Sequence, residues 1–195
     1  DLELLRWIHA NWHQSDIVNQ IMKCITISGN GGIIWIVTGV LLLLFRKTRI
    51  PGLVMLISLA AGFILNDLIL KPLVARQRPF LEDVSFCSFL AEIGLKEPTG
   101  YSFPSGHSFS SLNCAVVLTF FFKKKGLPLL LYALLIAFSR AFVLVHYPSD
   151  ILMGMIFGIM TAVTTIAVYR KIAEKAESKK KGDRITCLLY TSDAA

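Results

Sequence analysis

The 195-residue sequence is 54% hydrophobic and 17% charged, which argues against a soluble globular domain, where about a quarter of the residues are usually charged. Its length suits one domain rather than two. The formal net charge of +7 does not indicate nucleic-acid binding, because much of it lies in short clusters beside long uncharged runs. This pattern is typical of a protein that crosses a membrane several times, with the bilayer and not nucleic acid as its partner.

The N-terminal residues 1–26 predict an amphipathic segment that lies at the membrane surface. Residues 17–26 are too few and too polar to cross a bilayer by themselves. The sequence begins at Asp1 rather than at a methionine and shows no cleavable signal peptide, so the natural N-terminus is expected to lie upstream. The apolar residues of the helix, which have charged residues and histidines between them, are Leu4, Leu5, Trp7, Ile8 and Trp12.

Five apolar runs are each long enough to cross a hydrocarbon core of about 30 Å as a helix. Inside lipid a helix satisfies its own backbone hydrogen bonds, so helices are expected here. We therefore predict an all-α fold, a polytopic membrane helical bundle of about five transmembrane helices plus the N-terminal amphipathic helix. The predicted spans are residues 27–45, 52–70, 105–122, 127–145 and 151–169.

Positively charged residues between the spans predict how the chain is threaded. Basic residues follow the first, third and fifth spans, at 46–49, 123–125 and 170–171. Because Lys and Arg concentrate in cytoplasmic loops, these connections are predicted to lie inside. The N-terminal segment, the loop of residues 71–104 and the turn of residues 146–150 then lie outside. Three cations of the outer loop break this rule and need a separate explanation: Lys71, Arg76 and Arg78.

The loop between the second and third spans contains a short helical pattern. Its apolar residues recur at near-helical spacing, which predicts an external helix lying on the membrane. They are Phe86, Phe89, Leu90, Ile93 and Leu95.

The four cysteines do not indicate a metal site. Cys24, Cys87, Cys114 and Cys187 form neither a C-x-x-C pair nor a Cys/His spacing typical of zinc. They are expected to be free, partly buried thiols. A disulfide between Cys24 and Cys87 would require that both face an oxidising compartment.

The C-terminal residues 177–195 are expected to form a basic tail outside the membrane domain of residues 1–176. Three consecutive lysines at 179–181 open this tail. The last ten or so residues, from 185 onward, abandon the pattern and resemble translated adaptor or vector sequence. They are treated as non-native and excluded from the fold prediction.

Three clusters of polar residues lie on the same predicted outer face. Three cations that converge on one point would hold a tetrahedral oxyanion such as phosphate. Serine and glycine at a helix N-terminus offer that anion backbone N–H groups and a hydroxyl. Two histidines can divide the roles of nucleophile and general acid, provided that a carboxylate orients one of them. In chain order the clusters are Lys71 with Arg78-Pro79, then Pro104-Ser105-Gly106-His107, then Ser139-Arg140 with His146 and Asp150.

These clusters resemble the three-part signature of the type 2 phosphatidic acid phosphatase and vanadium haloperoxidase superfamily, in its membrane lipid phosphatase branch. The signature is intact and in the family's order from Lys71 to Asp150, and with flanking helices the resemblance covers roughly residues 25–170. It implies a helical bundle whose site lies at the outer membrane surface. The implied reaction is the removal of phosphate from a lipid phosphate, with no cofactor and no metal.

The same resemblance implies a role for each residue. His146 attacks phosphorus and forms a phosphohistidine, while Asp150 holds its other ring nitrogen. His107 protonates the leaving oxygen and then serves as base when water hydrolyses the intermediate. The residues implied to bind the phosphate are Lys71, Arg78, Ser105, Gly106 and Arg140.

Plainer interpretations of these residues stay open. Arg140 could extend its charge to the membrane interface, although an ionisable group inside a span is a functional candidate by default. Lys71 could pair with Asp67, one helical turn earlier. Arg76 lies outside the signature and reads best as a surface charge or a headgroup contact. Asp150 could serve as a negative charge at a helix N-terminus.

The substrate is the open question. A compact, bacterial-looking chain with an external site favours undecaprenyl diphosphate, in the bacterial cytoplasmic membrane, with phosphatidylglycerol phosphate and phosphatidate as close alternatives. Haloperoxidase activity is disfavoured, because the soluble haloperoxidases lack these spans. A catalytically silent protein that binds or transports a lipid phosphate is the competing class. His107, His146 and Asp150 argue against it, since binding alone needs only the cations.

Overall fold

The computed structural model describes residues 1–13 and 15–192, with side chains as far as Lys179. Throughout this described part the chain folds into helices and turns without a β-strand, which confirms the all-α prediction. The elements are α1 (Leu2–Trp12), α2 (Asp16–Ser28), the 3-10 turn η1 (Asn30–Gly32), α3 (Ile33–Leu44), α4 (Arg49–Phe63), the π-helix η2 (Ile64–Leu70), α5 (Lys71–Val74), the 3-10 turn η3 (Pro79–Leu81), α6 (Val84–Glu92), α7 (Gly106–Phe122), the 3-10 turn η4 (Lys123–Gly126), α8 (Leu127–Phe142) and α9 (Pro148–Ser192).

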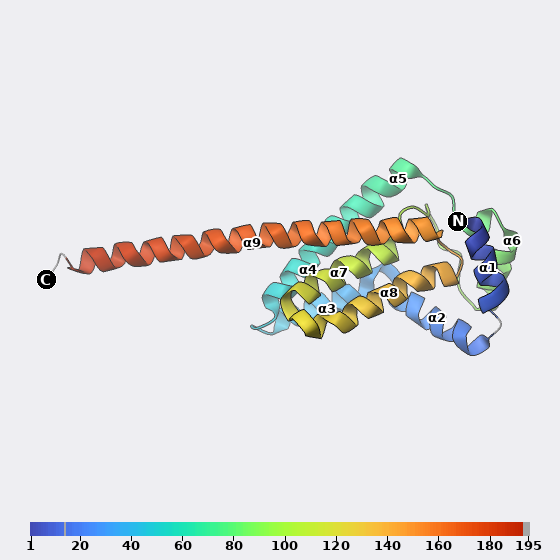
Figure 1. The fold of residues 1–195 in the computed structure, drawn as a ribbon, viewed down its shortest axis with the longest axis horizontal. Coiled ribbons are helices and arrows are strands. Elements are labelled where there is room, and N and C mark those ends of the chain that lie inside the picture. The colour runs from blue at the N-terminus through green and yellow to red at the C-terminus, as the bar shows by residue number, and fades with distance from the viewer. Residues whose placement is uncertain (14, 193–195) are drawn as a thin grey trace.

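Helix α7 is the centre of the bundle, and α4, α8 and α9 pack against it (Figure 1). Glycines permit a close crossing between α7 and α9. A Cβ atom on Gly154 would lie 2.6 Å from the backbone oxygen of Ser105, and one on Gly158 would collide with the backbone of Phe109. Because these two positions lack side chains, the start of α9 approaches the start of α7, where two of the predicted clusters lie.

By length and composition, the described residues include three helical runs able to cross a membrane: Arg49–Leu81, Gly106–Phe142 and Pro148–Lys179. A bent pair, Asp16–Ser28 with Asn30–Leu44, makes a fourth if it is taken as one span. The run Gly106–Phe142 holds two predicted spans, α7 and α8, which η4 joins into an antiparallel hairpin (Figure 1). The five predicted segments are therefore all helical.

The first span differs from the prediction of one helix over residues 27–45. The chain bends by 45° between α2 and α3. Gly31 (φ 58°) and Gly32 (φ 66°) adopt the left-handed conformation there, which glycine reaches without a steric cost. At about 1.5 Å per residue, α3 is too short to cross a hydrocarbon core of about 30 Å. Residues 16–28, which the sequence analysis set aside as short and polar, form the other arm.

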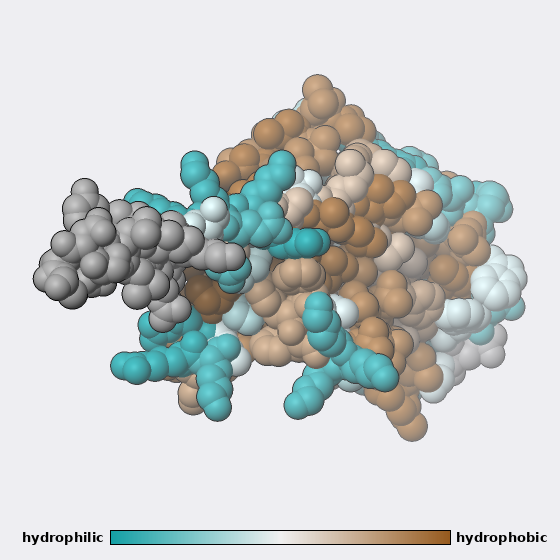
Figure 2. Space-filling model, turned by 60° about the vertical axis from the view of Figure 1, so that its left-hand side comes forward, coloured by the Kyte–Doolittle hydropathy of each residue, from teal (hydrophilic) through white to brown (hydrophobic). Residues whose placement is uncertain are grey.

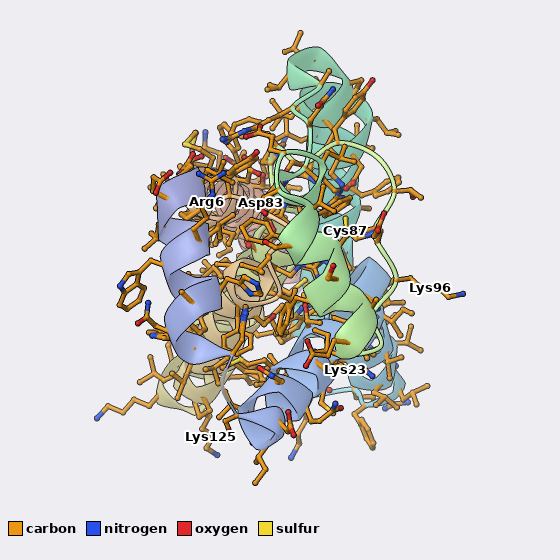
Figure 3. All side chains as sticks on the ribbon, turned by 90° about the vertical axis from the view of Figure 1, so that its right-hand side faces the viewer. Arg6, Lys23, Asp83, Cys87, Lys96 and Lys125 are labelled. Carbon is orange, nitrogen blue, oxygen red and sulfur yellow. The ribbon has the colours of Figure 1, made fainter. Side chains whose placement is uncertain are left out.

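Helices α1 and α6 lie side by side at one end of the bundle (Figure 3). Arg6 Nε donates to Asp83 Oδ2 at 2.9 Å, just before α6, and the ring of His9 contacts Phe86 and Phe89 edge-on. The helix predicted in the loop of residues 71–104 is thus present as α6. Its apolar face is buried in the protein rather than laid on the membrane, because α1 covers it. On α1 itself Leu5 and Ile8 are buried and the two tryptophans stay exposed, as expected of an amphipathic helix.

The motif clusters and the basic turns occupy opposite ends of the bundle. Helix α7 runs from the end that holds the motif clusters to η4, and α8 returns to the motif end. Helix α9 begins there, runs back alongside α7 and leaves the bundle as a single extended helix (Figure 1). Hydrophilic side chains gather at the end where α9 leaves, and a broad hydrophobic surface follows (Figure 2). The exposed lysines at 123–125 belong to this end. Helix α9 continues without a break past residue 177, where the sequence analysis began the basic tail.

Cys24, Cys87 and Cys114 are free thiols, so the disulfide between Cys24 and Cys87 is not formed. The side chain of Cys187 and the expected non-native segment from residue 185 lie outside the described side chains.

Candidate active site

Three loops bring the predicted clusters together. They follow α5, precede α7 and connect α8 to α9. The Ser102 backbone N–H donates to the Arg76 carbonyl at 2.8 Å, and the Ser105 N–H donates to the Asp150 carbonyl at 3.0 Å. These backbone hydrogen bonds join residues that are far apart in the sequence. They fix the positions of the three loops relative to one another.

Arg78 holds the three loops to one another. Its guanidinium is 5% exposed and donates to the carbonyls of Gly100 (Nε, 2.9 Å), Thr99 (Nη2, 3.2 Å) and Val145 (Nη1, 3.1 Å). Nη1 also lies 3.3 Å from His146 Nε2. Because all of these partners are neutral acceptors or a histidine nitrogen, the positive charge of Arg78 is not neutralised by its contacts.

Arg140 is the second buried cation. It is 5% exposed, its Nη1 donates to Thr26 Oγ1 at 2.6 Å, and its Nε has no hydrogen-bond partner. Within the described part of the chain, neither Arg140 nor Arg78 has a carboxylate at ion-pair distance. A buried charge without a counter-charge is costly, so these two guanidinium groups favour an anion between the helices.

Lys71, the third predicted cation, is paired. Its Nζ lies 2.5 Å from Asp67 Oδ1, the pairing that the sequence analysis kept as an alternative. A Cβ atom on Gly106 would lie 3.5 Å from the same Nζ, so the first residue of α7 leaves room beside the amine. The Lys71 amine therefore faces both a carboxylate and the amino end of α7.

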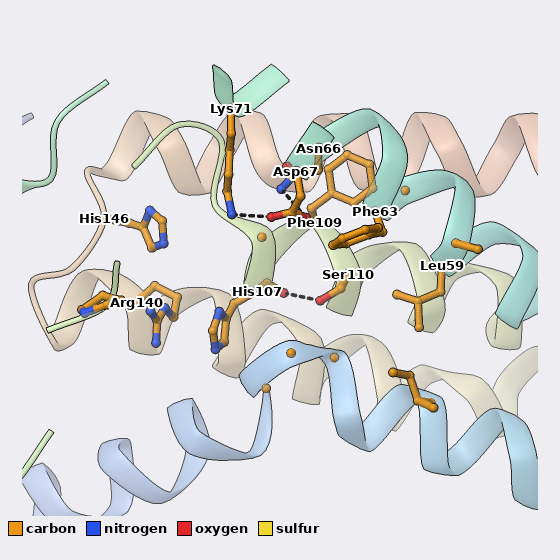
Figure 4. Close-up of a pocket in the computed structure, with 18 of the residues that line it drawn as sticks. Leu59, Phe63, Asn66, Asp67, Lys71, His107, Phe109, Ser110, Arg140 and His146 are labelled. Carbon is orange, nitrogen blue, oxygen red and sulfur yellow. Dashed lines mark hydrogen bonds and ion pairs between the residues drawn. The ribbon is translucent and has the colours of Figure 1, made fainter. Parts of the chain in front are cut away.

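A cavity of about 620 Å³ collects six of the eight predicted site residues (Figure 4). Its far wall is apolar and comes from α3 and α4, with Ile36, Leu56, Leu59 and Phe63. Ile36 is 44% exposed and Phe63 is 56% exposed on the hydrophobic surface of the molecule, so the cavity reaches from the cations to that surface. The six predicted residues that line it are Lys71, Arg78, Gly106, His107, Arg140 and His146.

His146 lines the cavity and is 2% exposed. Nδ1 and Asp150 Oδ2 are 3.8 Å apart, within ion-pair distance but too far for a direct hydrogen bond, so the predicted hold of Asp150 on this nitrogen stays a prediction. The Ser102 hydroxyl lies between them: it donates to Asp150 Oδ2 at 2.5 Å and is 3.4 Å from His146 Nδ1. The other nitrogen, Nε2, is the one beside Arg78.

The surroundings of His146 favour its neutral form. Burial lowers its pKa well below the ordinary value of 6.5, and the positive charges of Arg140 and Arg78 lower it further. At neutral pH the imidazole therefore keeps a free lone pair, which a nucleophile needs.

His107 lies in the first turn of α7 and faces the bend between α2 and α3. Its Nε2 is 2.9 Å from Asn30 Oδ1. A Cβ atom on Gly29 would lie 2.7 Å from His107 Cδ2, so only glycine lets the bend come this close. Residues 29–32 were expected only to open a membrane span. No pattern marked Asn30 as a partner of His107.

Ser105 and Asp150 do not line the cavity. Ser105 is the N-cap of α7, and its hydroxyl accepts from Ser108 Oγ at 2.9 Å. Its phosphate-binding role stays a prediction, as do the roles of the other residues. Asp150 is fully buried behind His146.

Arg76 is a site residue that the sequence analysis missed. It was interpreted as a surface charge or headgroup contact, but its Nη1 lies 2.7 Å from Asp150 Oδ1. The one signal in the sequence was its placement, since a cation in the predicted outer loop broke the charge rule. The contact joins residues 74 positions apart, so only the fold reveals it.

Residues 51–174, which contain all three clusters, match the family model described as PAP2 superfamily. The chain belongs to the PAP2 superfamily. The resemblance drawn from the motifs is confirmed.

Relatives of this PAP2 protein are enzymes of lipid phosphates. An undecaprenyl-diphosphatase of Sulfolobus acidocaldarius is 32% identical over 161 residues, which cover 81% of this chain and 73% of the relative. Undecaprenyl-diphosphatase BcrC of Bacillus subtilis is 28% identical over 158 residues, covering 81% of this chain and 78% of the relative. The crystal structure of a transmembrane PAP2-type phosphatidylglycerolphosphate phosphatase from Bacillus subtilis matches with a TM-score of 0.68 and 25% identity, covering 87% of this chain and 86% of that one. The PAP2 protein described here is an integral membrane hydrolase of lipid phosphates.

Proposed function

We propose that this protein removes phosphate from undecaprenyl diphosphate at the outer face of the bacterial cytoplasmic membrane, through a phosphohistidine on His146 and without a metal ion. One observation carries the proposal: two buried guanidinium groups without carboxylate partners, Arg78 and Arg140, lie beside a neutral histidine in one cavity. Such a site attracts a phosphate group and presents a nucleophile to it.

In the first step His146 Nε2 attacks phosphorus, and the bond from phosphorus to the bridging oxygen breaks. His107, which lines the same polar end of the cavity (Figure 4), gives a proton to the leaving oxygen. The negative charge that builds on the phosphoryl oxygens is stabilised by Arg78 and Arg140, with Lys71 as a third cation. These groups are fixed before the reaction, so little reorganisation is needed.

In the second step water attacks the phosphorus of the phosphohistidine. His107 takes a proton from this water, the P–N bond breaks, and His146 recovers its lone pair as inorganic phosphate leaves. The cations supply the positive charge that a divalent ion would otherwise bring, so no metal is required.

The apolar wall of the cavity supports a lipid substrate. The phosphate would lie among the cations, and the first part of the lipid chain would follow Leu59 and Phe63 to the hydrophobic surface. Undecaprenyl diphosphate is the preferred candidate because two of the relatives act on it by name, at 32% and 28% identity.

Phosphatidylglycerol phosphate is the second candidate, favoured by the solved structure with a TM-score of 0.68. Phosphatidate would use the same cations. A silent lipid-phosphate-binding protein is disfavoured, because binding does not require two histidines on the wall of the cavity.

A phosphate-release assay on the purified protein in detergent tests the proposal. The substrates are undecaprenyl diphosphate, phosphatidylglycerol phosphate and phosphatidate, each with and without EDTA. We expect the highest kcat/KM on undecaprenyl diphosphate, no change with EDTA, and no release by His146→Ala. A preference for phosphatidylglycerol phosphate would overturn the substrate, and a phosphoenzyme formed by His146→Ala would overturn the mechanism.

A further inference from the structure

The carboxylate of Asp150, behind His146, is held by three groups outside the family signature. Its Oδ2 accepts from the Ser102 hydroxyl at 2.5 Å and from the Tyr147 backbone N–H at 3.1 Å. Its Oδ1 pairs with Arg76 Nη1 at 2.7 Å. Asp150 and Ser102 are both fully buried, so water does not compete for these bonds.

We propose that Ser102 and Arg76 are positioning residues of the nucleophile. Ser102 links the Asp150 carboxylate to the His146 ring and so fixes the orientation and tautomer of the ring, and Arg76 keeps Asp150 in the orientation that this link requires. The proposal rests on the proposed function, in which His146 attacks phosphorus.

The direction of the hydroxyl proton follows from the chemistry of its neighbours. An ionised carboxylate only accepts hydrogen bonds, so the Ser102 O–H must point to Asp150. Its remaining lone pairs then face His146 Nδ1, 3.4 Å away, and favour the tautomer that carries hydrogen on Nδ1. The Ser102 backbone also faces the imidazole as an acceptor. The lone pair is thereby left on Nε2, the nitrogen beside Arg78 in the cavity.

Arg76 holds the opposite edge of the carboxylate. The same Nη1 donates to Ser149 Oγ at 2.8 Å, Nη2 lies 3.1 Å from Asp1 Oδ2, and the guanidinium packs 3.8 Å over the ring of Tyr147. With four contacts the planar group has one orientation. Asp150 therefore cannot turn Oδ2 away from Ser102 without losing the ion pair.

Arg76 also sets the charge that His146 experiences. The cations around the imidazole are Arg78, Arg140 and Lys71, the last paired with Asp67, and His107 lines the same cavity. Asp150 is the anion nearest the ring, and Arg76 partly neutralises it. Removal of the Arg76 charge would let Asp150 stabilise the imidazolium, so the pKa of His146 would rise.

The hydroxyl is tested with Ser102→Ala, with Ser102→Thr as the rescue. We expect Ser102→Ala to lower kcat roughly 10- to 100-fold, the range of one hydrogen bond to a charged group, with KM within about twofold. Threonine keeps the hydroxyl and should recover most of the rate. The matched control is Ser111→Ala, another buried serine, which accepts from Trp35 Nε1 and does not contact His146. A kcat loss equal to that of the control would overturn the role of Ser102.

The role of the positive charge of Arg76 is tested with Arg76→Gln, which removes the charge, and Arg76→Lys, which keeps it. In Arg76→Gln the acid limb of kcat/KM should move to higher pH, whereas Arg76→Lys should keep its position and lower kcat. All variants are compared on one substrate, so its own titration cancels. Arg6→Gln, which removes an exposed ion pair to Asp83, is the control and should not move the limb. An unmoved limb in Arg76→Gln would overturn the role of Arg76.

Phosphoenzyme trapping separates this inference from the proposed function. If His146→Ala still forms a phosphoenzyme, the mechanism itself is wrong. If that variant forms none while Ser102→Ala and Arg76→Gln behave like their controls, only the positioning roles are wrong. Should Ser102→Ala fail to fold in detergent, the two Arg76 variants still test whether the orientation of Asp150 controls His146.

Discussion

His146 and His107 line the same cavity, but the fold holds them by different means. His146 lies between α8 and α9, with Nδ1 at 3.4 Å from the Ser102 hydroxyl and Nε2 at 3.3 Å from Arg78. Its partners come from loops that are themselves joined by backbone bonds. His107 lies on α7 and meets Asn30 across a glycine bend, at 2.9 Å. The partners of His146 come from two loops, whereas those of His107, the Asn30 side chain and the backbone of Thr26, both lie at the bend between α2 and α3.

The difference matches the two proposed tasks. A nucleophile has to present one nitrogen in one tautomer, so rigid partners on both sides of the ring favour it. A general acid that later acts as a base has to lose and regain its proton, so a neutral amide partner suits it better than a carboxylate. If the two histidines have these different tasks, substitutions at each of them and at their neighbours should lower turnover by different amounts.

Replacement of His146 by alanine should have the largest effect. Without the nitrogen that attacks phosphorus, turnover should fall by at least about 10⁴-fold on every substrate, and no phosphoenzyme should form. Phosphate release and acid-quenched trapping of labelled phosphoprotein measure the two quantities. Equal residual turnover in His146→Ala and His107→Ala, with phosphoenzyme in both, would show that His146 is not the nucleophile.

His107→Ala should separate substrates by their leaving groups. On an alkyl phosphate monoester the rate should fall by about 10²- to 10⁴-fold, the usual contribution of a general acid. An aryl phosphate with an electron-poor ring should lose much less, because its phenolate leaves without a proton. Turnover of the two substrates is compared within the variant. An equal loss on both would show that His107 does not protonate the leaving oxygen.

Asn30→Ala should have a smaller effect on the same side of the cavity. The Asn30 side chain is an uncharged amide, so the loss of its contact with His107 Nε2 should lower kcat by about three- to tenfold. The matched control is Asn11→Ala, which removes an exposed amide that donates to the Trp7 carbonyl in α1. If Asn30→Ala affected the aryl and alkyl substrates equally, Asn30 would not act through the acid.

Both histidines are expected to face the outer compartment. Cysteine labelling at exposed positions tests this sidedness independently of enzyme activity. Lys96 lies at the site end and Lys124 in η4, and both side chains are exposed. In a background without the native cysteines, Lys96→Cys should react with an impermeant maleimide in intact cells, and Lys124→Cys should not. The reverse result would place the site in the cytoplasm.

Chelation should have no effect. Phosphate release in excess EDTA should equal release in its absence, because Arg78, Arg140 and Lys71 supply the charge. A strict requirement for an added divalent cation would mean that the cations around the two histidines do not suffice.

Much of the fold could be predicted from residue types along the chain. Apolar runs such as 52–70 and 151–169 are helical in the structure because backbone groups in lipid must find partners within the segment. The basic turns at 46–49 and 123–125 lie at one end because each span reverses the direction of the chain. The six signature residues in the cavity come together for the same reason, since they lie at the ends of spans that start or finish on one side.

Contacts between distant segments decided the rest. The apolar spacing of α6 predicted a helix, but α1, about 80 positions earlier in the sequence, determined that Phe86 is buried in protein. Arg76 looked like any exposed cation until the fold placed it against Asp150. Asp150 was expected to hold His146, but the sequence did not indicate that the Ser102 hydroxyl lies between the carboxylate and Nδ1, which are 3.8 Å apart. A hydrogen bond depends on differences of less than 1 Å, and a sequence pattern determines which residues share an end of the bundle but not their separation.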